Sequence, residues 1–388
     1  MIIHRLGEPT IEGYEAVPSG QFGLLGQDER FWNKLDRALD LAGRLGLILA
    51  LVPVWGSNVK NNRISLEEAA QYGKFLGQRY ASVPNIVWLN GGDVRGDENK
   101  QIWQTLGLSI KENDPDHLMT FHPVGQTDSS FWFHHEPWLD LNLFQSGHRR
   151  YGQLEAEGDY TYSNGLEEDN WRFVMRDFNL VPPKPTLDGE PSYEAIFQGL
   201  LNPNEPLWQD RDCRRYAWWS VLAGAAGHTY GHNAVMQMND SAHPQAYGCK
   251  TYWADALNAP GASQMSALCR LIHCFESEQR RGLFLCQEPR YYQHLALMKG
   301  PEFILAYSYQ GENIVLPSDL ADWPNPLFGW YDPRLGVFSS VQHVMANENH
   351  ITVIKPDRQD WTLVVTSPHY QKVCISHGID GAKFLLAV

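Results

Sequence analysis

Two acidic residues each stand directly after an apolar segment with the composition of a buried β-strand. Asp93 ends the run Ile-Val-Trp-Leu-Asn-Gly-Gly-Asp, and Glu190 ends the run Pro-Thr-Leu-Asp-Gly-Glu. Two carboxyl groups at strand ends are suited to acid–base work, and a pair that flanks a glycosidic bond can hydrolyse it. Taken singly, Asp93 could be a turn residue and Glu190 an ion-pair partner. The repetition of the same ending favours the catalytic interpretation.

Further polar and aromatic side chains follow the other apolar segments, where they would line the same cleft. Asp188 lies two residues before Glu190, and therefore on the same side of an extended segment. We interpret it as a supporting residue, with a buried capping carboxylate as the alternative. Side chains that could bind sugar hydroxyls or stack on a sugar ring are Trp55, Asn90, His122, Gln145, His148, Tyr230 and His232. Trp88 lies inside its segment and is expected in the core.

The sequence indicates neither a cofactor nor a metal. It has no Gly-rich phosphate loop, and its six cysteines form no Cys-x-x-Cys pair. His134, His135 and Glu136 are metal-ligand types, but no further ligand has helical or hairpin spacing, so we expect no metal. The cysteines are expected to be reduced thiols. Together with the lack of a visible signal peptide at Met1, this slightly favours a cytoplasmic setting.

Short apolar runs alternate with helical patterns from about residue 45 to residue 232. The predicted strands are Leu47–Val54, Asn85–Leu89, Leu118–His122, Leu141–Gln145, Pro185–Asp188 and His228–Tyr230. The predicted helices are Leu66–Tyr80, Gln101–Glu112, Asn170–Asn179 and Arg211–Ala223. Continuous apolar runs are typical of parallel strands, so we predict an α/β fold, specifically a (β/α)8 TIM-type barrel. A doubly wound sheet is the alternative, but it gives no reason for chemistry after every strand.

Six barrel strands can be recognised, whereas a closed (β/α)8 barrel has eight. The first 45 residues contain one predicted helix, Asp28–Leu45, and room for at most one short strand, Met1–His4. We therefore expect the barrel to lack its N-terminal strand or strands.

The pattern changes after about residue 258. A helix, Gly261–Cys274, is followed by short alternating segments with turn residues between them, which is typical of an antiparallel sheet or sandwich. These segments are Tyr291–Met298, Phe303–Tyr309, Phe328–Tyr331, His350–Ile354 and Thr362–Thr366. The last twenty residues match no pattern. The sequence thus predicts a barrel domain over residues 1–275 and a small antiparallel β-sandwich over residues 280–388.

The charge of the chain argues against two classes of partner. The formal charge is −14 and is spread along the sequence, so there is no basic face to bind nucleic acid or an anionic membrane surface. No apolar run reaches the ~20 residues that a membrane-spanning helix needs. Fourteen Trp and seventeen Tyr suit a sugar-binding cleft, although a large core would also use them. A carbohydrate is the partner that we expect, and the oligomeric state is not indicated.

Several motifs together resemble the apiosidase-like enzymes, glycoside hydrolase family 140. The segment Asn85–Asp93 is similar to the family's fourth-strand motif. Further similar segments are Leu118–Pro123, Glu136–Asp140, Gln145–His148, Leu187–Pro191, Ala217–Val221 and Gly227–His232. The resemblance is strong from about residue 45 to residue 238. It continues more weakly through Trp330–Arg334, which resembles a β-domain of the collagenase-like, collagen-binding type.

The resemblance implies a retaining (β/α)8 hydrolase, with Asp93 as acid/base after the fourth strand and Glu190 as nucleophile after the seventh. It implies a pectic side chain as substrate, the family's characterised sugar being a terminal apiose. This chain lacks the family's Asp-Thr-Ala-Trp-like motif of the first strand, in agreement with the strand count. Two other interpretations stay open. One is a catalytically impaired carbohydrate-binding protein of the same fold, and the other is an extracellular adhesion module.

Overall fold

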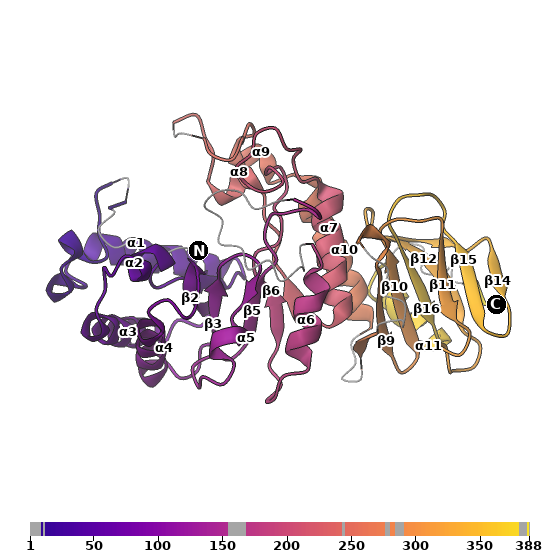
Figure 1. The fold of residues 1–388 in the computed structure, drawn as a ribbon, viewed down its shortest axis with the longest axis horizontal. Coiled ribbons are helices and arrows are strands. Elements are labelled where there is room, and N and C mark those ends of the chain that lie inside the picture. Colours follow the sequence, from indigo (N-terminus) through magenta and orange to yellow (C-terminus); the bar gives the residue numbers. More distant parts are fainter. Residues whose placement is uncertain are drawn as a thin grey trace. The chain divides into compact units, whose positions relative to one another are not determined.

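The structure, a computed structural model, describes residues 9–10, 12–153, 168–242, 245–275, 280–283, 291–379 and 386–387 (Figure 1). The chain forms two compact units. The first contains the described residues of Met1–Gln145 and Asp177–Gly189. The second contains those of Ser146–Asp159, Ser163–Arg176 and Glu190–Val388. No helix in the described ranges is long and apolar enough to span a membrane.

The first unit alternates strands and helices, coloured indigo to magenta in Figure 1. Its elements are η1 (Pro18–Gly20), η2 (Phe22–Leu24), α1 (Glu29–Arg44), β1 (Leu49–Leu51), α2 (Gly56–Lys60), α3 (Leu66–Tyr80), β2 (Ile86–Val94), α4 (Lys100–Asn113), β3 (Met119–Pro123), β4 (Thr127–Asp128), α5 (Ser130–Phe133), β5 (Asn142–Gln145) and β6 (Thr186–Asp188). β1, β2 and β3 pair in parallel, and so do β5 and β6, while β4 is antiparallel to β5. Parallel strands with intervening helices confirm the predicted α/β class.

Local sequence explains why α3 and α4 lie where they do. α3 begins at a capping box, in which the Ser65 hydroxyl accepts from the Glu68 backbone and the Glu68 carboxylate accepts from the Ser65 backbone. Gly73 lets the two helices pack closely, because a β-carbon there would lie 2.7 Å from Ser109 Cβ. The apolar faces of these helices and of β1 to β3 form one core. This core fixes the strand ends that carry the candidate residues.

The second unit begins with helices and ends in the β-sandwich. Its elements are α6 (Asn170–Phe178, whose last two residues belong to the first unit), α7 (Asp210–Ala223), β7 (Gly227–His228), α8 (Asn233–Met236), α9 (Trp253–Ala256), α10 (Pro260–Cys274), β8 (Arg281–Leu283), η3 (Tyr291–Gln293), β9 (Leu295–Gly300), β10 (Phe303–Ser308), β11 (Asn313–Pro317), β12 (Leu327–Asp332), β13 (Val337–Ser340), β14 (Val344–Ala346), β15 (His350–Ile354), β16 (Trp361–Thr366), α11 (Pro368–Ser376) and β17 (Leu386–Ala387).

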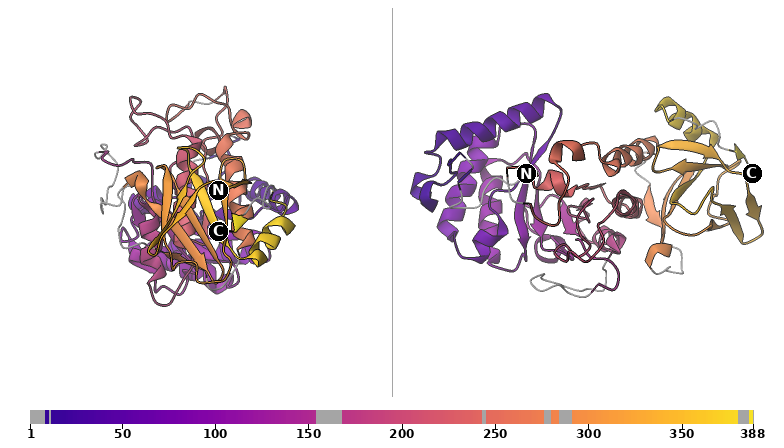
Figure 2. Two further views of the ribbon diagram at one scale, coloured as in Figure 1. Left: turned by 90° about the vertical axis from the view of Figure 1, so that its right-hand side faces the viewer. Right: turned by 90° about the horizontal axis from the view of Figure 1, so that it is seen from above.

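Two antiparallel sheets make up the sandwich, which Figure 2 shows in orange to yellow with α11 against its strands. One sheet has the order β13-β12-β16-β10-β9-β8, with β17 paired to β12. The other has the order β11-β15-β14. Apolar side chains from both sheets, among them Ile304, Leu316 and Leu363, form a common core. The predicted antiparallel C-terminal domain is thus confirmed.

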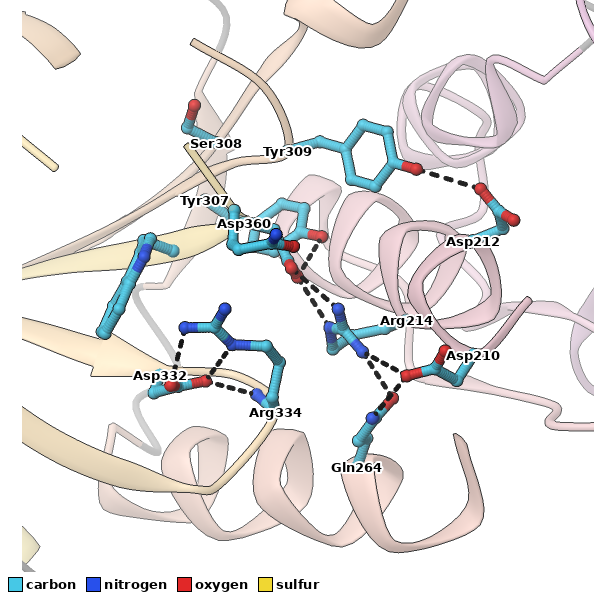
Figure 3. Close-up of polar contacts among 12 residues, drawn as sticks. Asp210, Asp212, Arg214, Gln264, Tyr307, Ser308, Tyr309, Asp332, Arg334 and Asp360 are labelled. Carbon is cyan, nitrogen blue, oxygen red and sulfur yellow. Dashed lines mark hydrogen bonds and ion pairs between the residues drawn. The ribbon is translucent and has the colours of Figure 1, made fainter. Parts of the chain in front are cut away.

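Helix α7 packs against the sandwich within the second unit. Trp218 stacks on Tyr307, with ring centroids 5.2 Å apart and an interplanar angle of 9°. Arg214 donates two hydrogen bonds to the Asp360 carboxylate, over 2.6 and 2.7 Å, and both side chains are buried (Figure 3). Gln264 on α10 accepts from the same guanidinium over 2.5 Å. A buried ion pair with such additional hydrogen bonds fixes α7 against the sandwich.

The predicted elements differ from the structure mainly at their ends. α3 and β15 have the predicted bounds, but the strand predicted over Leu47–Val54 is only β1, because Leu47 and Ile48 are exposed residues ahead of it. The segment predicted to begin at Tyr291 starts as the turn η3, and β9 begins only at Leu295. The sequence pattern missed α2, β4, α5, α8, α9, α11, β8, β11, β13, β14 and β17. The short strand predicted at Met1–His4 lies outside the described residues.

Candidate active site

β2 ends in a strained bulge that carries Asp93. The backbone is left-handed at Gly91 (φ 90°), Gly92 (φ 118°) and Asp93 (φ 49°), and the register with β3 shifts there. A β-carbon on Gly91 would lie 2.5 Å from the His122 carbonyl oxygen, and one on Gly92 would lie 2.6 Å from the Trp55 ring. Only glycine fits both positions. The Asp93 side chain is 46% exposed, and a carboxylate presented by a bulge at a strand end is typical of an active site.

His122 and Trp55 lie beside this carboxylate. His122 Nδ1 is 3.1 Å from the carbonyl oxygen of Pro123 and 3.8 Å from Asp93 Oδ1. Because a carbonyl only accepts, Nδ1 carries a proton in this contact. The ring centroid of Trp55, a partly exposed residue, is 6.3 Å from that of His122. At 3.8 Å, Nδ1 is too distant from Oδ1 for a direct hydrogen bond.

Three predicted site residues of the first unit are buried, Asn90 within β2 and the other two at strand ends. Asn90 Nδ2 donates to the Trp103 carbonyl oxygen over 3.1 Å, and Asn90 Oδ1 accepts from the Gly91 backbone over 3.2 Å, so this amide stabilises the bulge. Asp188 is fully buried at the end of β6. Gln145 is also buried, and its Oε1 has no hydrogen-bond partner among the described residues. A buried acceptor without a partner is costly, so a ligand hydroxyl or a water would fit there.

Glu190 and His148 meet in the second unit. His148 Nε2 is 3.1 Å from Glu190 Oε1, and only 14% of the Glu190 side chain is exposed. The carboxylate accepts, so Nε2 carries the proton. The His148 carbonyl oxygen accepts from Gly199 N over 2.6 Å and from Trp208 Nε1 over 3.0 Å. The Glu190 carbonyl oxygen accepts from Gly147 N over 2.9 Å. The histidine is therefore held in place to orient one carboxylate oxygen of Glu190.

Tyr230 and His232 lie after β7, which ends at His228, two residues earlier than predicted. The Tyr230 hydroxyl donates to Glu194 Oε2 over 2.8 Å, and Gly261 N donates to the same oxygen over 3.0 Å. Burial raises the pKa of Glu194 despite these hydrogen bonds. His232 Nδ1 accepts from Ala234 N over 3.1 Å and caps α8, and burial lowers the pKa of His232. Burial thus disfavours the charged forms of both the His232 imidazole and the Glu194 carboxyl group.

A family model described as "Apiosidase-like, catalytic domain" matches residues 3–278, which is well over half of the chain. The chain belongs to the apiosidase-like family. A second model, described as "Putative collagen-binding domain of a collagenase", matches residues 282–366 of this apiosidase-like chain.

Two solved structures are similar to the apiosidase-like chain over almost all of its length. One, described as a glycoside hydrolase, is 37% identical with a TM-score of 0.86, and the match covers 95% of this chain and 85% of the other. The second is a glycoside hydrolase family 5 protein from Bacteroides vulgatus, 35% identical with a TM-score of 0.88, with 95% and 82% covered. Among curated proteins no match was found. The predicted TIM-type glycoside hydrolase fold is confirmed.

The structure also shows site neighbours that the sequence did not single out. Glu194 and Tyr193 follow Glu190 within four residues, and the Tyr193 ring lies edge-on to His148 with centroids 5.0 Å apart. The His134 side chain in the apiosidase-like chain lies 3.3 Å from Asn142 Oδ1 and 3.0 Å from the Pro182 carbonyl oxygen. This histidine, which raised the question of a metal, contributes hydrogen bonds to the fold.

Proposed function

We propose that the chain is a retaining glycoside hydrolase that acts on a plant-type, pectic oligosaccharide or polysaccharide side chain. Glu190 is the proposed nucleophile and Asp93 the proposed acid/base. The observation that carries the proposal is that the two carboxyl groups differ in exposure and in hydrogen bonding. Glu190 is largely buried and bonded to His148, whereas Asp93 is presented to solvent by a strained bulge. We also propose the predicted domain boundary, with the barrel over residues 1–275 and the sandwich over residues 280–388.

The hydrogen bond to His148 suits Glu190 to nucleophilic attack. A hydrogen bond to a carboxylate favours its charged form, which is the form that attacks the anomeric carbon. His148 Nε2–H is directed at Oε1 of this carboxylate. Attack forms a covalent glycosyl–enzyme, and the bond to the leaving oxygen breaks.

Asp93 completes the proposed reaction in two steps. It first gives its proton to the leaving oxygen, and then takes a proton from the water that releases the sugar from Glu190. After the first step Asp93 is negatively charged, with His122 Nδ1 3.8 Å from its Oδ1. Retention requires the two carboxyl groups to lie about 5–5.5 Å apart when substrate is bound.

The remaining predicted residues are proposed to shape and line the sugar site. Trp55 offers a partly exposed ring next to Asp93, as stacking on a sugar face requires. Gln145 offers an acceptor for a sugar hydroxyl. Asn90 and Asp188 are buried and would act by supporting the strand ends. Proposed direct or supporting contacts of the second unit are His148, Tyr230 and His232.

A panel of nitrophenyl glycosides, including the apioside, tests the activity. We expect turnover of at least one member, with the anomeric configuration retained in the first product seen by NMR. Glu190→Gly should be inactive, and azide should restore a product of inverted configuration, a glycosyl azide. Inversion by the wild type would contradict the proposal. Binding of a pectic oligosaccharide without turnover would instead favour the carbohydrate-binding alternative.

A further inference from the structure

A buried arginine on α7 contacts both the sandwich and the rest of the second unit. Arg215 on α7 is fully buried, and its guanidinium carbon lies 4.7–5.1 Å from four aromatic ring centroids. These rings belong to Tyr216, Trp219, Tyr292 and Tyr309. Arg215 also forms an ion pair with Glu168, which is fully buried as well. Aromatic faces and an opposite charge compensate the guanidinium for the loss of water.

Glu168 has a second role in this cluster. Its Oε1 accepts a hydrogen bond from the backbone N–H of Tyr151 over 2.7 Å and another from the Tyr292 hydroxyl over 2.8 Å. Tyr292 lies in η3, shortly before strand β9 of the sandwich. The Tyr151 ring also packs edge-on against Tyr292, with centroids 5.3 Å apart. One carboxylate oxygen thus ties the sandwich to the backbone of Tyr151.

Tyr151 lies three residues after His148, in the segment that follows Gln145. The near end of this segment is held by the bonds of Gly147 and His148 described above. The far end is held at Tyr151 by Glu168. A shift of the far end would be transmitted over three residues to the ring that contacts Glu190. Misplacement of a catalytic group by a fraction of an ångström is enough to lower the rate.

We infer that Tyr292 is a positioning residue: through Glu168 it holds the segment that carries His148, so that the sandwich helps to orient the proposed nucleophile. The inference rests on the proposed function for its kinetic consequence, but the contact itself is independent of it. The sandwich therefore does more than cover α7, because it also holds the segment that carries His148.

Tyr309 provides a matched comparison within the same cluster. Its ring also faces Arg215, but its hydroxyl donates to Asp212 Oδ1 on α7 over 3.0 Å. Figure 3 shows this contact between Tyr309 and Asp212. Tyr309→Phe and Tyr292→Phe each remove one hydroxyl and keep the ring. Only Tyr292→Phe removes a bond to Glu168.

The test combines hydrogen exchange, melting temperature and kinetics on the full chain. For Tyr292→Phe we expect faster exchange of the amides in residues 146–153 and a kcat about tenfold lower on a cleaved aryl glycoside, with little change in KM. Tyr309→Phe should leave that exchange unchanged and kcat within about twofold, even if both variants lose similar thermal stability.

Equal effects of the two variants on exchange and kcat, or unchanged exchange in Tyr292→Phe, would overturn the inference. The exchange comparison needs no turnover. If the wild type cleaves no substrate, the proposed function fails, and exchange still decides whether Tyr292 holds the segment.

Discussion

The surroundings of Asp93 and Glu190 position the two carboxyl groups in different ways. At Asp93 the backbone positions the carboxylate. Three left-handed residues and a bulge expose it, and His122 Nδ1 lies 3.8 Å from Asp93 Oδ1. At Glu190 a side chain positions the carboxylate, because His148 donates a hydrogen bond to it in a site with little exposure. An acid/base must exchange protons with the leaving group and water, whereas a nucleophile must be held and kept charged. The difference between the two regions supports the roles proposed for Asp93 and Glu190.

The largest expected effect comes from Glu190→Gln. The amide keeps the shape and one acceptor oxygen, but it cannot form a glycosyl ester, so turnover of every substrate should fall by at least about 10⁴-fold. Initial rates on an activated aryl glycoside measure the loss. A variant that retains more than about one hundredth of the activity would show that this carboxylate is not the nucleophile.

Asp93→Asn should have a smaller effect that depends on the leaving group. Loss of general acid–base catalysis costs about 10²–10⁴-fold on substrates with poor leaving groups. On a dinitrophenyl glycoside the first step needs no proton, so the glycosyl–enzyme should form quickly and accumulate. Added azide should then speed its release with retained configuration. Equal losses on good and poor leaving groups would remove the acid/base role from Asp93.

Gly92→Ala should disturb the bulge without changing any charge. The new β-carbon would meet Trp55 at 2.6 Å with φ at 118°, so we expect about 3 kcal/mol of lost stability and a lower kcat. Gly46→Ala is the control, because Gly46 has φ of 72° but no atom within 4 Å of the added carbon. It should cost about 1 kcal/mol and leave kcat unchanged. Denaturant unfolding and kinetics of both variants separate strain at the site from strain in general.

The smallest expected effect is on the pH dependence of stability and comes from Glu194, four residues after Glu190. Burial raises its pKa, so the folded state holds its proton more tightly than the unfolded state. The resulting stability is present below pH 4.5 and is lost as pH rises through the raised pKa. Glu194→Gln should abolish this part of the pH dependence, with a relative shift in Tm of about 2 °C between pH 4.5 and pH 8. Parallel Tm profiles for the wild type and the variant would contradict this account.

Some parts of the fold and of the candidate site could be predicted from the sequence, and others could not. The position of Asp93 was predictable, because a glycine pair before a carboxylate marks a strand end where side chains would clash. Helix α11 was not, because Cys374 is its one buried residue among those described, so it has no apolar stripe. Glu194 was missed because a buried carboxyl group looks like any other glutamate in sequence. The Arg215 cluster joins Glu168 to Tyr292, 124 positions later in the chain, and only the folded chain brings them together.

The central claim, that Glu190 is the nucleophile, is tested most directly by trapping the covalent intermediate. A 2-deoxy-2-fluoro glycoside of the sugar that the wild type cleaves slows both steps, and a good leaving group lets the glycosyl–enzyme accumulate. Peptide mapping by mass spectrometry then locates the label. We expect it on Glu190, with labelling strongly slowed in His148→Ala. A label on any other residue would contradict the account.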